Sequence, residues 1–394
     1  MKSLTYTATF LLAAVYGVKS YDEPEVYMNT SQLITSKGYP CEEHDVHTQD
    51  GYILNIQRIP HGLSSAPVGG SRPVVLLQHG LLSCSACWVE NLANNSLGFM
   101  MADAGFDVWL GNSRGNTYGR RHEHLQASSH EFWKFSWDEM AKYDLPATVD
   151  LILQKTGASQ IFYIAHSQGC EIALAQLSHD RALNGKIKAF GALSPAVFLG
   201  HVSSPIRLLT PIVSGGEILL NMLGTGEFLP NMATTRMLGR TFCNLPGRLN
   251  HICENILFVL AGYDAKQMNE SRLPVYIGQH PAGTSTQNII HYAQSINSGK
   301  FQMYDYGFLV NLAKYHQTSA PEYRLEDVTT PILLYTGTND ALVTPTDITK
   351  LVSHLPSLVK HTIINGWEHL DFMWAMNAPE MCYNDLIREM KLRV

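Results

Sequence analysis

Three residues far apart in the sequence, Ser167, Asp340 and His369, have the types and the chain order needed for nucleophilic attack on an ester. Ser167 lies in the segment A-H-S-Q-G (165–169), between an apolar run and an alanine-rich segment. A sharp strand-to-helix turn exposes such a serine, and a histidine held by a carboxylate accepts its proton. The pattern predicts that Ser167 is the nucleophile. The alternative is a serine that caps the following helix.

The residues around the serine must let a strand and a helix approach closely, so the positions two before and two after it must be small. Gly169 meets this requirement, whereas Ala165 stands where glycine is usual. We expect some crowding from its methyl group but an intact turn. The backbone N–H of Gln168 is expected to donate to the oxyanion, together with that of Leu81 in the loop after an early strand. The alternative for that loop is that Gly80 only turns the chain.

Asp340 and His369 are the predicted acid and base because each follows a predicted strand, in the segments "PILLYTGTND" and "INGWEHLDFMWA". The imidazole of His369 is expected to accept the serine proton, while Asp340 holds the other ring nitrogen and favours the imidazolium. The carboxyl ends of parallel strands meet at one edge of a sheet, so residues distant in sequence can converge there.

Two other acids and two other histidines compete for these roles: Asp347, Asp371, His354 and His361. Asp347 lies beyond Pro345 and is expected inside the next helix. Asp371 follows His369 so closely in sequence that it cannot easily face it. Neither alternative histidine follows the last predicted strand, so the first assignment is preferred.

Short apolar runs that end in Gly, Ser or Asn predict the strands that position these residues: 72–80, 106–112, 160–167, 187–195, 330–340 and 361–366. Residues 43–60 have strand-forming residues on both sides of Asp50-Gly51, which predicts a β-hairpin. Amphipathic helices are expected between the strands, one of them after an Asp144 cap. Strands alternating with helices predict an α/β fold, with a mostly parallel sheet covered on both faces.

This alternation stops between residues 203 and 321, a segment rich in Gly, Met and Phe. We predict a cap or lid inserted into the sheet domain, over the carboxyl ends of the strands where α/β sheets bind ligands. The predicted parts are a signal peptide (1–20), the first part of the core (21–202), the cap (203–321) and the second part of the core (322–394). The alternative is a second, independent helical domain.

The composition excludes several classes of protein. The formal net charge of the 394 residues is −6, and the chain has no basic run, which argues against a nucleic-acid partner. The 17 histidines are compatible with an acidic compartment. No set of Cys and His residues has the spacing of a zinc site, and no motif implies a cofactor. We expect a monomer that needs neither a metal nor a cofactor.

The N-terminal sequence "MKSLTYTATFLLAAVYGVKS" is typical of a secretory signal, and no later stretch is long and apolar enough to span a membrane. Glycosylation sequons begin at Asn29, Asn94 and Asn269, in agreement with export. We therefore expect a secreted protein, with a lysosome-like organelle as the alternative.

The seven cysteines are not spaced as a disulfide scaffold. Cys243 and Cys253 lie close together in a loop-rich segment and are the natural pair in an oxidising compartment. Cys84 and Cys87 form a C-S-A-C motif. Its surroundings and the export route do not favour a redox role.

Seven segments together resemble the acid lipase family, which contains gastric and lysosomal acid lipases: "LQHGLL", "NNSLGFMMADAGFDVWLGNSRGN", "FSWDEMAKYDLPATVD", "AHSQG", "PAGTS", "GTNDALV" and "HLDFMWA". The hairpin region "GYPCEEHDVHTQDGYILNIQRIP" is similar to that family as well. The resemblance covers nearly the whole chain after the leader. It departs from the family pattern at Ala165 and at Glu368, where a neutral residue is expected, and we hypothesise that the extra carboxylate shifts the pH profile.

This resemblance implies an α/β-hydrolase fold with a cap and lid. It assigns the nucleophile to Ser167, the acid to Asp340 and the base to His369, the oxyanion amides to Leu81 and Gln168, and a disulfide to Cys243–Cys253. It implies a serine esterase that hydrolyses triacylglycerols or cholesteryl esters at a lipid–water interface, often at acid pH and without a metal. The alternatives are a carboxylesterase of small soluble esters and a lipase-like protein that only binds lipid.

Overall fold

The computed structural model describes residues 24–64, 72–207, 226–230, 262 and 266–394. The predicted signal peptide (1–20) lies outside the described residues, and so do Cys243 and Cys253.

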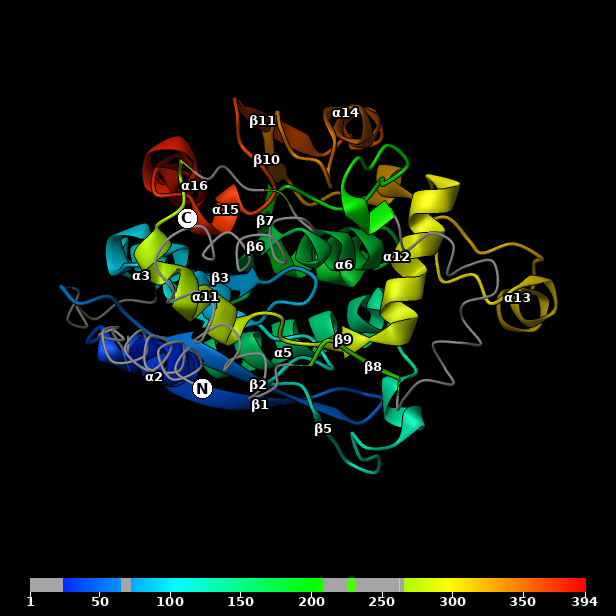
Figure 1. Ribbon diagram of the computed structural model, residues 1–394, viewed down its shortest axis with the longest axis horizontal. Helices are drawn as coiled ribbons and strands as arrows, with labels where there is room; N and C mark the ends of the chain where they lie inside the picture. The colour runs from blue at the N-terminus through cyan, green and yellow to red at the C-terminus, as the bar shows by residue number, and fades with distance from the viewer. Residues whose placement is uncertain (1–23, 65–71, 208–225, 231–261, 263–265) are drawn as a thin grey trace, which may run out of the picture.

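A central sheet runs through the molecule, and its strands succeed one another from β1 at the bottom of Figure 1 to β11 at the top. The strand order is β1-β2-β4-β3-β6-β7-β10-β11, with β5 paired to β2. From β4 to β11 the neighbouring strands are parallel, whereas β1, β2 and β5 are joined antiparallel. The strands are β1 Glu42–His47, β2 Tyr52–Ile59, β3 Val74–Gln78, β4 Asp107–Leu110, β5 Arg121–His122, β6 Ile161–His166, β7 Ile187–Leu193, β10 Ile332–Gly337 and β11 Leu358–Ile364.

The predicted hairpin and all six predicted strands are confirmed. Successive residues of β3 alternate between two apolar clusters: Leu76 faces one, while Val75 and Leu77 face the other. This alternation is expected of a strand with both faces buried, and it explains why the strand sequences are continuously apolar.

Helices cover both faces of the sheet. Residues of α4, α5, α6, α12 and α14 contribute to the first apolar cluster, and residues of α2, α3, α11, α15 and α16 contribute to the second. The described α-helices are α2 Thr30–Ser36, α3 Leu97–Asp103, α4 Trp137–Glu139, α5 Leu145–Thr156, α6 Gln168–Leu177, α7 Arg181–Lys186, α11 Leu273–Gln279, α12 Thr286–Ser298, α13 Phe308–Tyr315, α14 Pro345–Ser353, α15 Asp371–Trp374 and α16 Asn384–Lys391. Met140–Asp144 and Pro379–Tyr383 form π-helical turns. None of the described helices is both long and apolar enough to cross a membrane.

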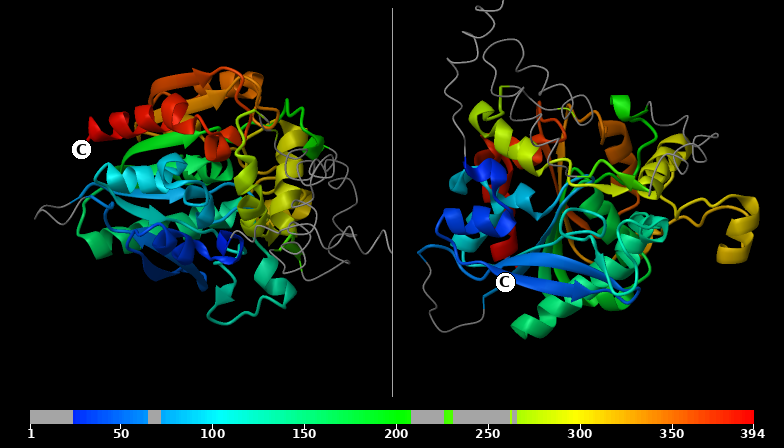
Figure 2. Two further views of the ribbon diagram at one scale, coloured as in Figure 1. Left: turned by 60° about the vertical axis from the view of Figure 1, so that its left-hand side comes forward. Right: turned by 60° about the horizontal axis from the view of Figure 1, so that its bottom comes forward.

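In its described part, the segment between β7 and β10 contributes no strand to the central sheet. It forms α11, α12, α13 and a separate two-stranded sheet of β8 (Glu227–Phe228) and β9 (Thr284–Ser285). In the left view of Figure 2, α11 and α12 lie beyond the ends of the strands. Tyr276 of α11 and Ile296 of α12 belong to the same apolar clusters as the sheet, so these helices share its core.

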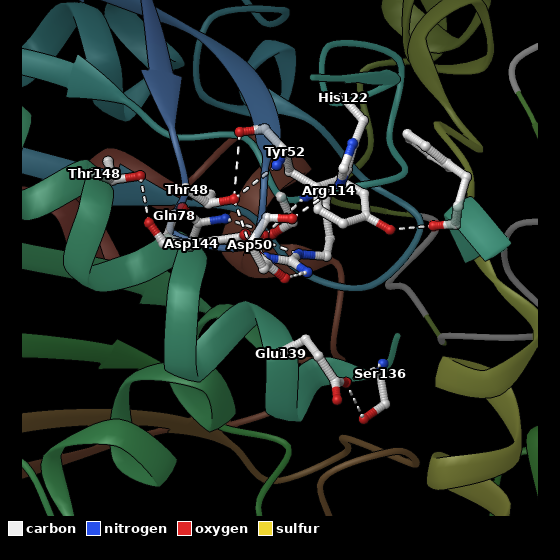
Figure 3. Close-up of polar contacts among 12 residues, drawn as sticks. Thr48, Asp50, Tyr52, Gln78, Arg114, His122, Ser136, Glu139, Asp144 and Thr148 are labelled. Atoms are coloured by element: carbon white, nitrogen blue, oxygen red, sulfur yellow. Dashed lines mark hydrogen bonds and ion pairs between the residues drawn. The ribbon is translucent and has the colours of Figure 1, made fainter. Parts of the chain in front are cut away.

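The prediction that Asp144 caps α5 is wrong. Its backbone is helical (φ −67°, ψ −49°), because α4, the π-helical turn and α5 continue one another without a break. The cap of this whole segment is Ser136, which forms a capping box with Glu139 (Figure 3). The carboxylate of Asp144 instead accepts a hydrogen bond from the backbone N–H of Arg114 (3.0 Å).

Arg114 joins the loop after β4 to the β1–β2 hairpin and to α5 (Figure 3). Its Nε donates to Asp144 (2.9 Å) and its Nη1 to Asp50 (2.6 Å), and its guanidinium lies 4.0 Å from the ring centre of Tyr52. Burial raises the pKa of Asp144, although Arg114 opposes this shift. The ion pairs therefore compensate for charges that the fold has removed from water.

We expect Arg114→Met to lower the free energy of unfolding by about 3–5 kcal/mol at pH 7, because it leaves the buried Asp144 carboxylate without its cation. Urea unfolding followed by circular dichroism measures the change. Without Arg114, the pKa of Asp144 in the folded variant should rise further. At pH 4 the folded variant then binds a proton more readily than the unfolded chain does. The loss of unfolding free energy should therefore be smaller at pH 4 than at pH 7. Lys142→Met removes the same charge from an exposed side chain and should change stability by less than about 0.5 kcal/mol. Equal effects of the two substitutions would contradict this account.

Candidate active site

Ser167 occupies the sharp turn between β6 and α6, with a φ of 53° and a ψ of −118°. A non-glycine residue at positive φ is strained, and such strain collects at functional sites. The approach of strand and helix is close: a Cβ atom at Gly169 would lie 2.7 Å from the carbonyl oxygen of Gln78 and 2.8 Å from that of His79. Position 169 therefore tolerates only glycine. Ser167 has a side chain, and its positive φ is an unfavourable backbone conformation for such a residue.

Ala165 is accommodated without disturbing this turn. It pairs with Gln78 of β3 and Ala192 of β7, and it is fully buried in the first apolar cluster. Its carbonyl oxygen lies 3.1 Å from the thiol of Cys170 in the first turn of α6. The methyl group thus fills space in the core, and the departure from glycine is compatible with the strand-to-helix turn.

Ala165→Gly should keep the turnover of a soluble ester within about threefold, because the turn already forms with alanine. The same change should lower the free energy of unfolding by about 1–2 kcal/mol, through a lost buried methyl and a more flexible strand. Steady-state kinetics and urea unfolding measure the two effects. Ala165→Val, which adds bulk in the tightly packed core, should reduce turnover more than tenfold. A large loss of activity in Ala165→Gly would mean that the alanine has a role in the turn beyond filling space.

The structure brings Ser167, His369 and Asp340 into one hydrogen-bonded chain. The Oγ of Ser167 lies 2.9 Å from Nε2 of His369, and Nδ1 of His369 lies 2.8 Å from Oδ2 of Asp340. Because a carboxylate only accepts, we assign the imidazole proton to Nδ1, which leaves Nε2 to accept the serine hydroxyl proton. All three residues are buried. The backbone N–H groups of Leu342 and Val343 donate to Oδ1 of Asp340 and fix the carboxylate.

The competing residues have other partners. Asp347 lies in α14, as predicted, and binds Nδ1 of His201 (2.8 Å), while Asp371 accepts from the backbone N–H of Glu368 (2.7 Å). His361 contacts the hydroxyl of Thr336, and His354 bonds within its own turn at the end of α14.

Two residues beside the triad were missed by the sequence analysis. The hydroxyl of Ser194, just after β7, donates to Oδ2 of Asp340 and lies 3.2 Å from Nδ1 of His369. The imidazole of His166 bonds to the carbonyl oxygen of His369 (3.0 Å), and the two rings lie 4.7 Å apart. Ser194 has a φ of 43°, but no sequence pattern marks this residue. The only sequence feature that could have pointed to His166 is its position next to Ser167.

Ser194→Ala should reduce kcat on a soluble ester by roughly tenfold or more with little change in KM, since a hydrogen bond to a charged group contributes about 1.5–3 kcal/mol. The expected cause is a less firmly held Asp340 carboxylate when the imidazolium forms. Ser178→Ala is the matched control, because Ser178 is also buried but bonds only within its own region, to the carbonyl oxygen of Ala175 and to His179. Equal kcat values for the two variants would show that Ser194 does not position the acid.

His79 fixes the loop that contains Gly80 and Leu81. Its Nε2 accepts from the backbone N–H of Ser113 and the side chain of Asn116, both at 3.1 Å, so its Nδ1 carries the proton and donates to the carbonyl oxygen of Gly80 (2.8 Å). Burial lowers the pKa of His79 to about 4, which keeps the ring neutral. Ser113 precedes Arg114, so the ion-pair cluster of Figure 3 also supports this loop.

Of the two predicted oxyanion donors, Gln168 directly follows Ser167, and Leu81 follows Gly80 in the loop after β3. Gln168 is the first residue of α6. Gly80, which precedes Leu81, lies against the serine: a Cβ atom at Gly80 would be 2.9 Å from Cβ of Ser167. Gly80 therefore has more than a turning role, because only glycine allows this loop to approach Ser167 so closely.

A cavity of about 250 Å³ adjoins the triad, with Ser167, His369 and Leu81 in its wall. The other described residues of the wall are mostly apolar and include Leu199, Val202, Ile206, Ile296, Leu342 and Met373. Such a wall favours a long hydrocarbon chain over a charged substrate.

The C-S-A-C motif has no redox geometry. Cys84 and Cys87 are both free and buried, and burial raises the pKa of Cys84 to about 12. Neither thiol is therefore available as a thiolate. Glu368 is half-buried, and its backbone N–H donates to Asp371. Its effect on the pH profile remains a prediction.

The part of the chain that the structure describes contains no cluster of His, Cys, Asp or Glu side chains that could hold a metal ion. Nothing in the hydrogen-bonded chain from Ser167 to Asp340 calls for one.

The fold and the site define an α/β-hydrolase. Residues 73–375 match the family model "alpha/beta hydrolase fold", and residues 30–92 match "Partial alpha/beta-hydrolase lipase region". Among solved structures, a putative lipase from Sulfolobus solfataricus superposes with a TM-score of 0.58 at 15% identity, covering 90% of this chain and 99% of that one. A monoacylglycerol lipase from Paleococcus ferrophilus gives a TM-score of 0.51 at 16% identity, covering 86% and 98%. At such identities these likenesses show the fold alone.

The sequence relatives are more specific, and they show that the chain belongs to the acid lipase family. It is 45% identical to gastric triacylglycerol lipase of Rattus norvegicus over 377 residues, which is 95% of each chain. It is 46% identical to the human gastric enzyme over 374 residues, covering 95% and 93%. It is 45% identical to lysosomal acid lipase/cholesteryl ester hydrolase of Macaca fascicularis over 369 residues, covering 93% and 92%. The predicted family and fold are confirmed, and with them the class of enzyme, a carboxylic ester hydrolase of the lipase type.

Proposed function

We propose that this protein hydrolyses triacylglycerols or cholesteryl esters through an acyl-enzyme intermediate on Ser167. The observation that carries the proposal is the chain of hydrogen bonds from Ser167 through His369 to Asp340 at the wall of an apolar cavity. The names of the gastric and lysosomal relatives support the same substrates.

In the first step, His369 Nε2 takes the hydroxyl proton as Ser167 Oγ attacks the ester carbonyl carbon, and Asp340 stabilises the imidazolium. The carbonyl oxygen becomes an oxyanion, which the backbone N–H groups of Leu81 and Gln168 bind. The tetrahedral adduct collapses, the alcohol leaves with the proton from His369, and the acyl group stays on Ser167. Water then repeats the sequence, with His369 as the base, and releases the fatty acid.

We also propose that residues 203–321 form the cap between core parts 21–202 and 322–394. Ile206, Leu229, Tyr292 and Ile296 from this segment line the cavity beside Ser167, which supports a cap rather than an independent domain. A roof that moves to admit a lipid would exclude water during the reaction.

The same proposal includes export to the extracellular space or to a lysosome. It also includes glycans at Asn29, Asn94 and Asn269 and a disulfide between Cys243 and Cys253. Asn29 and Asn94 are exposed and Asn269 is half-buried. The side-chain oxygens of Asn29 and Asn269 accept backbone hydrogen bonds, an arrangement that leaves the nitrogen, the atom that carries a glycan, pointing away from these bonds.

The test compares hydrolysis of emulsified triolein, emulsified cholesteryl oleate and a soluble short-chain ester from pH 4 to pH 8, for the wild type and for Ser167→Ala. We expect hydrolysis of at least one emulsified ester and a loss of more than about 10⁴-fold in the variant, since nucleophile and base act as a unit. Activity confined to the soluble ester would favour a carboxylesterase. Activity that survives in Ser167→Ala would contradict the mechanism, and an intact wild type without activity on any ester would favour a lipid-binding protein.

A further inference from the structure

Helix α13 carries apolar side chains that the described part of the protein does not cover. Phe308, Leu309, Val310 and Leu312 are exposed to 63%, 75%, 50% and 47%, and we call these four residues the α13 patch. Figure 1 and the right view of Figure 2 show α13 at the tip of an arm that projects beyond α12. Exposed large apolar residues that are adjacent in sequence and on one projection mark an interaction site.

The arm is firmly built at its base. Its two sides pair in an antiparallel manner, with Met303 N–H donating to Pro321 O (2.8 Å) and Tyr323 N–H to Phe301 O (2.9 Å). Asp138 of α4 accepts from the backbone N–H of Tyr304 (2.7 Å) and from the hydroxyl of Tyr323 (2.8 Å). The arm is therefore fixed to the hydrolase core.

Polar contacts hold the helix itself. Asn311 is the one buried residue of α13, and its side chain accepts from Tyr306 N–H (2.9 Å) and donates to Asp305 Oδ1 (2.7 Å). The hydroxyl of Tyr315 donates to the carbonyl oxygen of Tyr304 (2.9 Å). The usual arrangement of a surface helix is thus reversed, with the polar side chain inward and the apolar ones outward.

The arm is attached to the helix that lines the active-site cavity. Gln294 of α12 forms two hydrogen bonds with the backbone of Asp305, at 2.8 and 2.9 Å. Its neighbours on the same helix, Tyr292 and Ile296, are part of the cavity wall. One rigid helix therefore connects the patch with the site of hydrolysis.

The charges near the patch suit a lipid surface. Residues 307–320 include no acidic residue, and the only formal cation among them is Lys314. The Nζ of Lys314 donates to the hydroxyl of Tyr306 (2.8 Å) and lies 4.1 Å from the centre of its ring. Tyrosine and lysine beside an apolar patch are the residues that settle at the boundary between lipid and water.

A second copy of the chain is a poorer occupant. An eight-residue helix is about 12 Å long. Two such convex tips in contact would bury far less than the ~1,200 Å² of a stable interface. A lipid surface requires no matching shape, since the side chains insert into hydrocarbon.

We propose that the α13 patch inserts into the lipid–water interface and anchors the enzyme to its aggregated substrate. The proposal deepens the proposed function and rests on it, because the lipid surface in question is that of the substrate. Apolar insertion, assisted by Lys314 where the surface is anionic, raises the local concentration of lipid ester at the cavity without taking part in the reaction.

The test measures binding separately from hydrolysis. In the full-length chain with Ser167→Ala, the further change Phe308→Ser/Leu309→Ser should weaken partitioning onto phosphatidylcholine-coated triolein droplets at least tenfold in a flotation assay. The matched control is Val359→Ser/Ile363→Ser, which alters two apolar residues of β11 that are also more than half exposed, and it should leave partitioning unchanged. With Ser167 intact, Phe308→Ser/Leu309→Ser should lower hydrolysis of the droplets at least tenfold and keep hydrolysis of a soluble short-chain ester unchanged.

Unchanged partitioning of Phe308→Ser/Leu309→Ser would overturn the proposal, and so would an equal loss in the β11 control. A dimer that dissociates in the variant during analytical ultracentrifugation, with partitioning unchanged, would assign the patch to a second copy and also overturn it. Failure of the wild type to hydrolyse both emulsified triolein and emulsified cholesteryl oleate would count against the proposed function instead. The flotation result with the inactive chain does not depend on that outcome.

Discussion

The start of α6 meets the end of β3 at very close range, and the geometry around Ser167 follows from this contact. A side chain at Gly169 would collide with the carbonyl oxygens of Gln78 and His79, so there is no room for a side chain between the helix and the strand at this point. At this contact Ser167 adopts a positive φ, and its hydroxyl lies within hydrogen-bond distance of His369. It also places the start of α6 next to the Gly80 loop, so the same contact positions Ser167 and the two residues proposed as oxyanion donors, Leu81 and Gln168.

A strained turn of this kind persists only when the surroundings hold it. Here the support consists of buried polar groups that are fully engaged. Burial keeps His79 neutral, and both of its ring nitrogens form hydrogen bonds. Ser113, which bonds to His79, is held in place by the ion pairs of the adjacent Arg114.

The burial of His79 affects the stability of the fold in acid. A histidine whose folded pKa is about 4 binds its proton less readily than in the unfolded chain, so its contribution to stability is lost as the pH falls from about 6.5 to 4.

Asp138 acts in the opposite direction. Burial raises its pKa to about 6, so its folded form binds a proton more readily than the unfolded chain, and the fold gains stability as the pH falls through 6. A carboxylate whose pKa is raised in this way offsets part of the stability that neutral His79 loses in acid. The same residue anchors the arm of α13, which links the pH response of the fold to a surface element far along the chain.

The strands of the central sheet and the family could be predicted from the amino-acid sequence, and both predictions are confirmed. The assignment of Ser167, Asp340 and His369 as nucleophile, acid and base stays a prediction. Apolar runs and turn residues are local signals. Ser167 directly follows β6, Asp340 lies three residues after the end of β10, and His369 lies five residues after the end of β11. The cap at Asp144 was predicted wrongly because a local rule cannot foresee that Arg114, 30 residues earlier, claims the carboxylate. Three features are visible only in the folded protein: which acids and histidines pair, the positions of Ser194 and His166 beside Asp340 and His369, and the outward-facing apolar side of α13. Those features depend on contacts between segments distant in sequence. Periodicity cannot predict such contacts, because it shows that one face of a helix or strand is apolar but not which segment covers that face.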